Sequence, residues 1–373
     1  MTQPTEHAVA IVGAGPIGLE VAWALKRDGI EYVHFEAGQI GATMQWWAPG
    51  TTFFSSPERI QIAGIPLVTP DQSKATREHY LAYLRQVASA RQLDVMTGTR
   101  VVMAQRIGKG FVLTTRPSMA GVGGPVEAGD AQGAMNHAGE RQWQVGTVVL
   151  AIGNMHRARL LDVPGEDLPF VSHYLDEPHV YFRRRVVIVG GKNSAVEAAI
   201  RLYRAGAHVT MSYRGDEFSK RVKYWLRPEI QWLIEQGRIT FHARTQVECI
   251  EASTGARGCG CVVLHCAVNG STTVVDADHV LLLTGYEQDL SLFEMFGVKV
   301  EGDDRMPVHD EATMQSNVHG VYIAGTACGG TPVSGVKVFI ETSHDHAERI
   351  VASLAGRTAP KPTVSAEQLL PES

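Results

Sequence analysis

Three glycines near the start of the chain have the spacing of a loop that binds a diphosphate. The residues from Gly13 onward read Gly-Ala-Gly-Pro-Ile-Gly, a complete G-x-G-x-x-G pattern. In such a loop Gly13 permits a tight turn, Gly15 lets a diphosphate approach the backbone, and Gly18 lets the following helix pack on the preceding strand. Pro16 and Ile17 begin that helix, whose free N–H groups and positive dipole end face the diphosphate. The pattern predicts a dinucleotide site; the alternative is a glycine-rich turn without a ligand.

The elements on either side of this loop match a nucleotide-binding unit. The apolar run Ala8–Val12 predicts a buried strand. A second predicted strand ends at Glu36, which lies 18 residues after Gly18. That is close to the roughly 20 residues expected before a carboxylate that binds ribose hydroxyls. We therefore assign Glu36 and the adjacent Ala37 to the cofactor site, and the acid and the position near the N-terminus favour FAD over NAD.

A second loop of the same kind follows another apolar run, Val186–Val189. It reads Gly-Gly-Lys-Asn-Ser-Ala, so a lysine occupies the position of the middle glycine. That lysine could donate its ammonium group to a phosphate, and the Asn-Ser pair suits a helix start whose N–H groups face phosphate. The residues that we assign to this site are Gly190, Lys192, Asn193, Ser194 and Ala195.

No carboxylate occupies the ribose-binding position after the second loop. The predicted strand His208–Met211 is followed by basic residues instead, namely Arg214, Lys220 and Arg221. An arginine without an acid at this position is typical of a site for the 2′-phosphate of NADPH, which favours NADPH over NADH. The alternative is a group of solvated surface charges that Asp216 and Glu217 partly neutralise.

The composition is that of a globular protein with room for two domains. The chain has 373 residues, 44% of them apolar and 20% charged, and a domain takes about 100–200 residues. A formal net charge of −5 argues against general nucleic-acid binding. Because the sequence lacks an apolar run of about 18 residues and a secretory signal, we expect no membrane span and a cytoplasmic location. The five cysteines include no C-x-x-C pair, so we expect reduced thiols and no metal site.

The two glycine loops begin 177 residues apart, which is typical of two nucleotide-binding units in one chain. We expect an α/β protein with two Rossmann-like dinucleotide-binding domains and a β-meander. The predicted meander strands are Val101–Gln105, Phe111–Thr115 and Trp143–Leu150. The expected organisation is an FAD-binding domain of residues 1–165 and 287–358, an NAD(P)H-binding domain of residues 166–286, a flexible insertion over 116–141 and a disordered tail over 359–373.

Three further segments resemble the strand–glycine junctions of flavoproteins that bind two dinucleotides. They are Val148–Gly153, Leu281–Tyr286 and Val321–Thr326. The third resembles a segment that normally ends in Gly-Asp and binds the flavin ribityl chain, and Thr326 here replaces the acid. The cofactor contacts that this resemblance implies are Val101, Ala151, Gly153, Gly285, Gly325 and Thr326.

More specifically, the chain resembles the bacillithiol-disulfide reductase family of thioredoxin-reductase-like flavoproteins. The segments that carry the resemblance are Thr52–Ser56, His173–Tyr174, Gly190–Ala195, Ser212–Gly215 and Phe339–Glu341. The resemblance implies that electrons pass from NADPH through FAD to a low-molecular-weight disulfide or a similar small acceptor. A homodimer is common among such proteins. The family carries a cysteine, its suspected redox-active group, at the position of Ile17, and isoleucine cannot form a mixed disulfide.

Two residues near the C-terminus are candidates for a direct part in the chemistry. The resemblance places Lys337 and Val338 near the pyrimidine end of the flavin, where Lys337 could stabilise negative charge; alternatively it is an exposed lysine at a helix start. We expect that helix to begin near Gly335. Cys328 follows the ribityl segment, and a thiol beside a helix N-terminus could be reactive and replace the missing loop cysteine. The alternative for Cys328 is a small packing residue.

Three other functions stay open on the sequence. One is electron transfer to ferredoxin or flavodoxin, which needs no cysteine and could use basic residues such as Lys220 and Arg227 to attract an acidic partner. A second is a flavin monooxygenase, although the F-x-G-x-x-x-H-x-x-x-W pattern typical of that class is absent. The third is a redox sensor that binds both cofactors without turnover.

Overall fold

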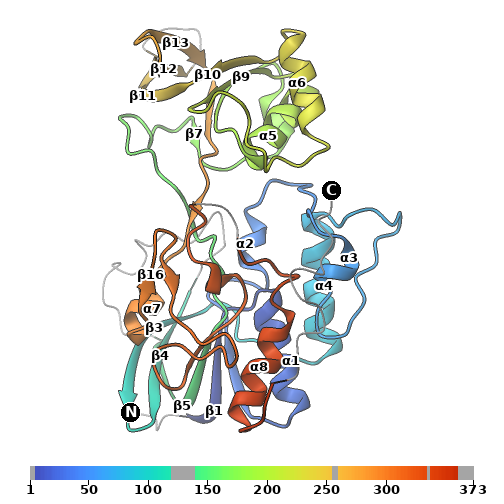
Figure 1. The fold of residues 1–373 in the computed structure, drawn as a ribbon, viewed down its shortest axis with the longest axis vertical. Coiled ribbons are helices and arrows are strands. Elements are labelled where there is room, and N and C mark those ends of the chain that lie inside the picture. Colours follow the sequence, from blue (N-terminus) through green and yellow to red (C-terminus); the bar gives the residue numbers. More distant parts are fainter. Residues whose placement is uncertain (1–4, 119–138, 254–258, 334–336, 360–373) are drawn as a thin grey trace. The chain divides into compact units, whose positions relative to one another are not determined.

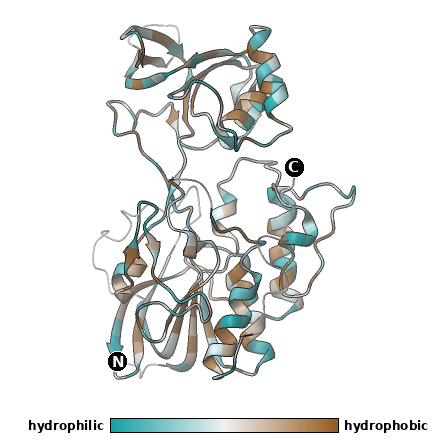
Figure 2. Cartoon of the chain, viewed as in Figure 1, coloured by the Kyte–Doolittle hydropathy of each residue, from teal (hydrophilic) through white to brown (hydrophobic). Residues whose placement is uncertain are grey.

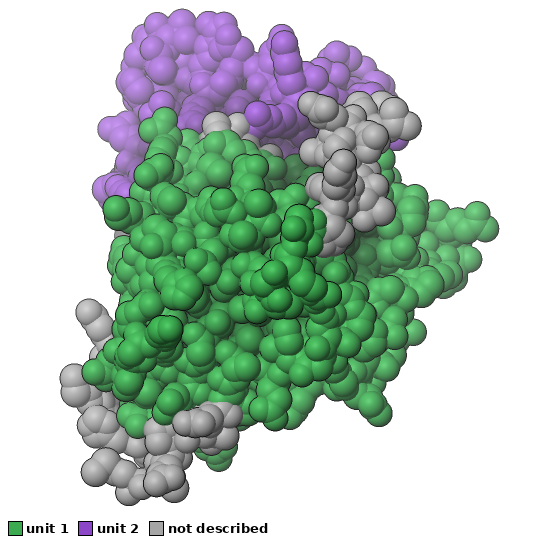
Figure 3. Space-filling view, turned by 60° about the horizontal axis from the view of Figure 1, so that its bottom comes forward, with its two compact units in different colours: residues 1–46, 50–157, 286–372 green, residues 47–49, 158–285, 373 purple. Residues whose placement is uncertain are grey.

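The computed structural model describes residues 5–118, 139–253, 259–333 and 337–359. The chain divides into two compact units, which Figure 3 distinguishes by colour. Unit 1 comprises residues 1–46, 50–157 and 286–372, and unit 2 comprises residues 47–49 and 158–285. Most of the expected insertion over 116–141, and the tail beyond residue 359, lie outside the described residues.

Unit 1 is built on a six-stranded mixed sheet in the order β2-β1-β5-β4-β3, with β18 also beside β5 (Figure 1). The strands are β1 (Thr5–Val12), β2 (Tyr32–Phe35), β3 (Thr99–Ile107), β4 (Gly110–Pro117), β5 (Arg141–Leu150) and β18 (Val321–Ile323). β1, β2, β5 and β18 run parallel, whereas β3, β4 and β5 form the antiparallel meander. The first part of β5 pairs with β4 and its last three residues pair with β18. The three predicted meander strands are therefore confirmed.

Helices join and cover the strands of unit 1. They are α1 (Pro16–Arg27), α2 (Ala42–Gln45), α3 (Pro57–Ile60), α4 (Arg77–Ala90), α7 (Ser291–Phe296), the 3-10 helix η3 (Gly325–Gly329) and α8 (His344–Leu354). Short strands are β6 (Arg157–Ala158), β15 (Tyr286–Glu287), β16 (Val300–Glu301) and β17 (Met306–Pro307). α1 packs on β1, β2 and α8, and Ile17, Val21 and Leu25 form an apolar stripe along it that is buried. The helix start expected near Gly335 lies outside the described residues; residues 337–343, which follow it, are not helical, and α8 begins at His344.

Unit 2 contains a parallel five-stranded sheet in the order β10-β9-β8-β14-β7. Its strands are β7 (Val171–Ser172), β8 (Arg185–Val189), β9 (His208–Tyr213), β10 (Thr240–Ala243) and β14 (His279–Leu282). An antiparallel meander of β11 (Thr245–Ala252), β12 (Gly260–Cys266) and β13 (Thr272–Ala277) accompanies it. The helices are η2 (Pro178–Tyr181), α5 (Asn193–Arg204) and α6 (Arg227–Glu235).

The sheet of unit 2 buries both of its faces. Side chains alternate along β8, so that Val186 and Ile188 enter a core with α5 and α6, while Val187 and Val189 enter a core with β12. A strand buried on both faces is apolar throughout, which explains the continuous hydrophobic run in the sequence. Figure 2 shows hydrophobic strands beside helices that carry both hydrophobic and hydrophilic residues. Within the described part of the chain, no helix has the length and apolar character needed to cross a bilayer.

Candidate dinucleotide-binding sites

The first glycine loop connects β1 to α1 in unit 1, and its three glycines are needed for different reasons. Gly13 has a φ of +102°, and a Cβ there would lie 2.5 Å from the carbonyl oxygen of Ala151. A Cβ on Gly18 would lie 2.0 Å from the carbonyl oxygen of Gly13. A Cβ on Gly15, in contrast, has no heavy atom within 4 Å. Two glycines are therefore required by the protein's own packing, and only Gly15 leaves space that a ligand could use.

The start of α1 offers unsatisfied backbone donors beside this space. Gly15 is the N-cap residue and has no side chain to accept the N–H groups of the first turn. Pro16 is the first helical residue and is half-buried, while Ile17 is buried. The helix dipole and these N–H groups favour an anion at the loop. The geometry thus fits a diphosphate, and the cradle at Gly15 is where it would approach.

Glu36 lies at the end of β2 next to this loop. Its carboxylate accepts hydrogen bonds from the N–H groups of Ala14 and Gly38, each at 2.7 Å. Burial raises the pKa of Glu36, while these hydrogen bonds and the charge of Arg100 oppose the shift. Ala37 is half-buried beside it. The carboxylate is thus fixed at the position from which it could accept ribose hydroxyls.

A buried histidine that the sequence analysis did not identify supports the same loop. His34 on β2 is fully buried, and its Nε2 donates to the carbonyl oxygen of Gly13 at 2.9 Å. Burial lowers the pKa of His34 to about 4, although the bond to Gly13 opposes the shift. Neutral imidazole therefore holds the turn. A histidine within an otherwise apolar strand was the signal that could have revealed it.

The parallel strands β5 and β18 bring two of the predicted flavin segments together. Ala324 N–H donates to the carbonyl oxygen of Leu150 at 3.0 Å, which places the residues after both strands side by side. A Cβ on Gly153 would lie 3.7 Å from Thr326 Oγ1, and a Cβ on Gly325 would lie 3.1 Å from the Ile17 side chain. Ala151, Gly153, Gly325 and Thr326 therefore belong to one site with the first loop. Val101 is buried in β3 opposite Thr115 and contributes to the core of the sheet.

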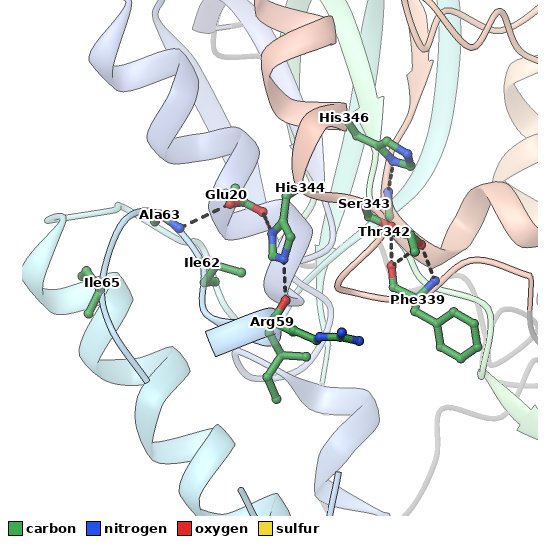
Figure 4. A network of polar contacts seen from close by, with 12 residues as sticks. Glu20, Arg59, Ile62, Ala63, Ile65, Phe339, Thr342, Ser343, His344 and His346 are labelled. Carbon is green, nitrogen blue, oxygen red and sulfur yellow. Dashed lines mark hydrogen bonds and ion pairs between the residues drawn. The ribbon is translucent and has the colours of Figure 1, made fainter. Parts of the chain in front are cut away.

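A network of polar contacts fixes the helices beside this site (Figure 4). His346 Nδ1 accepts the N–H of Gly325 at 3.0 Å, and burial, together with the charge of Arg349, lowers the pKa of His346 to about 3. The neighbouring His344 lies between the carboxylate of Glu20 on α1, at 2.9 Å, and the carbonyl oxygen of Arg59, at 2.7 Å. Burial lowers the pKa of His344, but the hydrogen bond to Glu20 and its charge outweigh burial and raise the pKa overall.

The surroundings of Cys328 and Lys337 differ from those expected for catalytic groups. Cys328 is buried in η3, and burial raises the pKa of its thiol well above the usual range. Such a thiol is not the thiolate that the sequence suggested, because the ionised form needs water or positive charge. Lys337 is exposed and forms an ion pair of 2.5 Å with Asp304. Val338 is half-buried, 3.3 Å from where a Cβ on Gly329 would lie.

The second glycine loop connects β8 to α5 in unit 2. Gly190 has a φ of +145°, and a Cβ there would lie 2.6 Å from the carbonyl oxygen of Leu283. Lys192 is the N-cap residue of α5 in an extended conformation, the place that Gly15 has in the first loop. The side chain of Asn193 binds the carbonyl oxygen of Arg221 at 3.1 Å and the N–H of Lys223 at 2.7 Å. This fixes the loop that follows β9 against the start of α5.

The remaining predicted residues of unit 2 lie on the same loops. Ser194 is exposed in the first turn of α5. Ala195 is buried, and a Cβ on Gly190 would lie 2.9 Å from the Cβ of Ala195. Gly285 has a φ of +108°, and a Cβ there has no heavy atom within 4 Å. Lys220 is exposed on the segment between β9 and α6.

Several cations converge on the second loop. Partial burial lowers the pKa of Lys192, and the charges of Arg159, Arg214 and Arg221 lower it further. Asp216, which the sequence suggested as a neutralising acid, instead pairs with Arg244, with one contact at 2.8 Å. Like charges repel each other, and an anion bound between them would offset this repulsion. The cluster therefore fits a phosphate group. Among the described residues, no group of three or more histidine, cysteine, aspartate or glutamate side chains is placed to hold a metal ion.

Comparison with known proteins shows the family to which the chain belongs. Residues 10–120 and 136–325 match the family described as pyridine nucleotide-disulphide oxidoreductase. The chain is 32% identical over 353 residues to "Bacilliredoxin reductase Bdr" of Bacillus subtilis, covering 94% of this chain and 98% of the relative. It is 28% identical over 320 residues to a "Ferredoxin--NADP reductase" of Ignicoccus hospitalis, covering 84% of this chain and 88% of the relative.

A solved structure has the same fold as this chain. The structure of "Bacillithiol Disulfide Reductase Bdr (YpdA)" from Bacillus cereus matches with a TM-score of 0.82 and 31% identity, covering 94% of this chain and 99% of the other. The expected two-domain flavoprotein reductase fold and the expected family resemblance are thus confirmed. The chain is an oxidoreductase that belongs to the pyridine nucleotide-disulphide oxidoreductase family.

Proposed function

We propose that unit 1 binds FAD and unit 2 binds NADPH. The observation that carries the first assignment is the open space at Gly15, beside the start of α1 and the fixed carboxylate of Glu36. The cation cluster around Lys192 supports NADPH, because a 2′-phosphate would relieve the repulsion among these charges. A ribose-binding acid as in the first loop would instead repel that phosphate.

The flavin, when bound, supplies the chemistry of accepting hydride and passing on two electrons. The residues of unit 1 hold and orient it. The start of α1 places N–H donors at the diphosphate, and Glu36 accepts ribose hydroxyls. His34 and His346 stay neutral and fix the backbone at Gly13 and Gly325. In unit 2, Lys192 and Arg214 bind phosphate and so orient the dinucleotide.

The proposed acceptor is a low-molecular-weight disulfide. Support comes from the bacilliredoxin and bacillithiol-disulfide reductases that this chain resembles. The overall reaction is NADPH + H⁺ + RSSR → NADP⁺ + 2 RSH, which balances two electrons and two protons. Cys328 is the single cysteine of unit 1 and is buried, and Ile17 has no thiol. We therefore propose that the disulfide receives electrons without a cysteine of unit 1.

Anaerobic titration of the purified flavoprotein tests this proposal. Addition of NADPH should bleach the flavin absorbance, and a low-molecular-weight disulfide should restore it with release of two thiols per NADPH. A protein that takes up no FAD, or whose flavin NADPH fails to reduce, would refute the proposal. Reoxidation by ferredoxin but not by a panel of disulfides would refute the acceptor alone.

A second candidate function is electron transfer to a small redox protein. The observation that favours it is the absence of an accessible thiol in unit 1, since such transfer needs no cysteine. The relative named ferredoxin–NADP reductase supports it at lower identity. Cytochrome c reduction that depends on added ferredoxin would distinguish this function from disulfide reduction.

The nucleotide preference and the assembly need separate tests. Arg214→Ser should raise the KM for NADPH about tenfold and leave the KM for NADH unchanged, because NADH has no 2′-phosphate. Equal effects on both nucleotides would refute the phosphate contact. The homodimer that the resemblance implies can be tested by light scattering of the FAD-loaded protein.

A further inference from the structure

Gln288 is a buried glutamine at the junction of the predicted flavin segments. It follows β15, and only 2% of its surface is exposed. Its Nε2 donates to the carbonyl oxygens of Gly153 and Ala327, both at 3.0 Å. Its backbone N–H donates to Thr331 Oγ1 at 3.1 Å. One side chain therefore connects the loop after β5 with η3.

The orientation of this amide follows from its partners. Both contacts are backbone carbonyl oxygens, which can only accept, so the NH₂ group must face them. Gln288 Oε1 is buried and has no donor among the described residues. The contribution of the side chain within the described structure is therefore donation by Nε2. Without it, the buried carbonyl group of Ala327 and the part-buried carbonyl group of Gly153 would lose a donor, which is unfavourable where water is excluded.

A second amide strengthens the same junction. Asn154, also buried, donates through Nδ2 to the carbonyl oxygen of Gly330 at 3.0 Å. Beyond the pairing of β5 with β18, two side chains thus connect the loop after β5 with the η3 segment. Thr326 directly precedes Ala327 and is at the position where the resembled family has an acid that binds the ribityl chain.

We propose that Gln288 is a positioning residue for the flavin site, which fixes Gly153 and η3 at the separation that cofactor binding requires. The proposal rests on the assignment of FAD to unit 1. It goes beyond that assignment because it gives the role to a residue outside the glycine loops and junction motifs. The proposal requires a hydrogen-bond donor at residue 288. A side chain of the same size that can only accept would lose both hydrogen bonds.

Substitution with a titratable isostere tests the donor requirement. In Gln288→Glu, burial and the two carbonyl groups should raise the pKa of the new carboxyl group. The ionised side chain cannot donate, so affinity of the apoprotein for FAD should fall about tenfold at high pH. Acidification should recover part of the affinity, because the protonated carboxyl group donates to one carbonyl. Quenching of flavin fluorescence measures the dissociation constant.

Two other variants separate positioning from general destabilisation. Gln288→Met lacks any donor and should lose affinity at every pH, with an altered visible circular dichroism of bound FAD. Gln142→Glu, on the exposed start of β5, is the matched control and should bind as the wild type does. Wild-type affinity in Gln288→Met, or a loss in Gln288→Glu that does not depend on pH, would overturn the proposal. Failure of the wild type to bind FAD would instead refute the proposed function on which it rests.

Discussion

Alanine substitution at two glycines of the first loop should have opposite consequences. Gly15 has a φ of −74°, which any residue can adopt, and a Cβ there meets no heavy atom within 4 Å. A Cβ at Gly18 would lie 2.0 Å from the carbonyl oxygen of Gly13. Gly15→Ala should therefore affect the ligand, and Gly18→Ala should affect the fold.

The expected magnitudes follow from these distances. An added methyl group at residue 15 should change the stability of the apoprotein by less than about 0.5 kcal/mol. If a diphosphate approaches the backbone there, the same methyl should weaken FAD binding at least about tenfold, or about 1.4 kcal/mol. At residue 18 a backbone oxygen must move, and overpacking of this kind costs about 1–3 kcal/mol.

Two measurements on each variant separate the effects. Urea unfolding of the apoprotein gives stability, and fluorescence titration with FAD gives affinity. Wild-type FAD affinity in a folded Gly15→Ala protein would refute the assignment of the diphosphate to this loop. Wild-type stability in Gly18→Ala would show that the contact between α1 and the loop is looser than described.

Three further predictions concern titratable groups. Glu20 raises the pKa of His344, and Asp345 adds to the effect. The ion pair of His344 with Glu20 should therefore stabilise the fold below about pH 6.5 and lose this contribution as the pH rises through the folded-state pKa. The urea midpoint should fall more between pH 6 and 9 in the wild type than in Glu20→Gln. Cys328→Ala should leave NADPH-dependent turnover unchanged and lower the free energy of unfolding by about 1–2 kcal/mol, and a large loss of turnover in the folded variant would restore a redox role for the thiol. Buried Lys223 and half-buried Glu197 form an ion pair of 3.0 Å. Lys223→Met should therefore destabilise the protein by about 2 kcal/mol in urea unfolding, less than the roughly 3–5 kcal/mol for a fully buried pair. An effect below about 1 kcal/mol would show that solvent screens the pair.

Local patterns in the sequence predicted several elements of the fold, because each of these elements has a recognisable pattern of apolar residues or glycines. The apolar run before each glycine loop predicted β1 and β8, and the first glycine loop predicted a helix beginning at Pro16, which is α1. Gly13 and Gly18 could be assigned from the loop pattern because the positive φ of Gly13 and the contact of Gly18 with Gly13 are local, whereas the contact of Gly13 with Ala151 is long-range. Downstream of Gly335, the apolar residues of Val338–Ile340 did not reveal that α8 begins only at His344.

Long-range contacts decided what the sequence could not. Burial of Cys328 and the resulting shift of its pKa depend on segments that pack around η3. The roles of His34 and Gln288 depend on carbonyl groups at Gly13, Gly153 and Ala327, which the fold brings near. The sequence alone therefore located the two glycine loops, since the glycine spacing and the apolar run before each loop are local features. Tertiary structure decided which side chains are charged, buried or bound, because desolvation and hydrogen bonding arise only when distant segments meet.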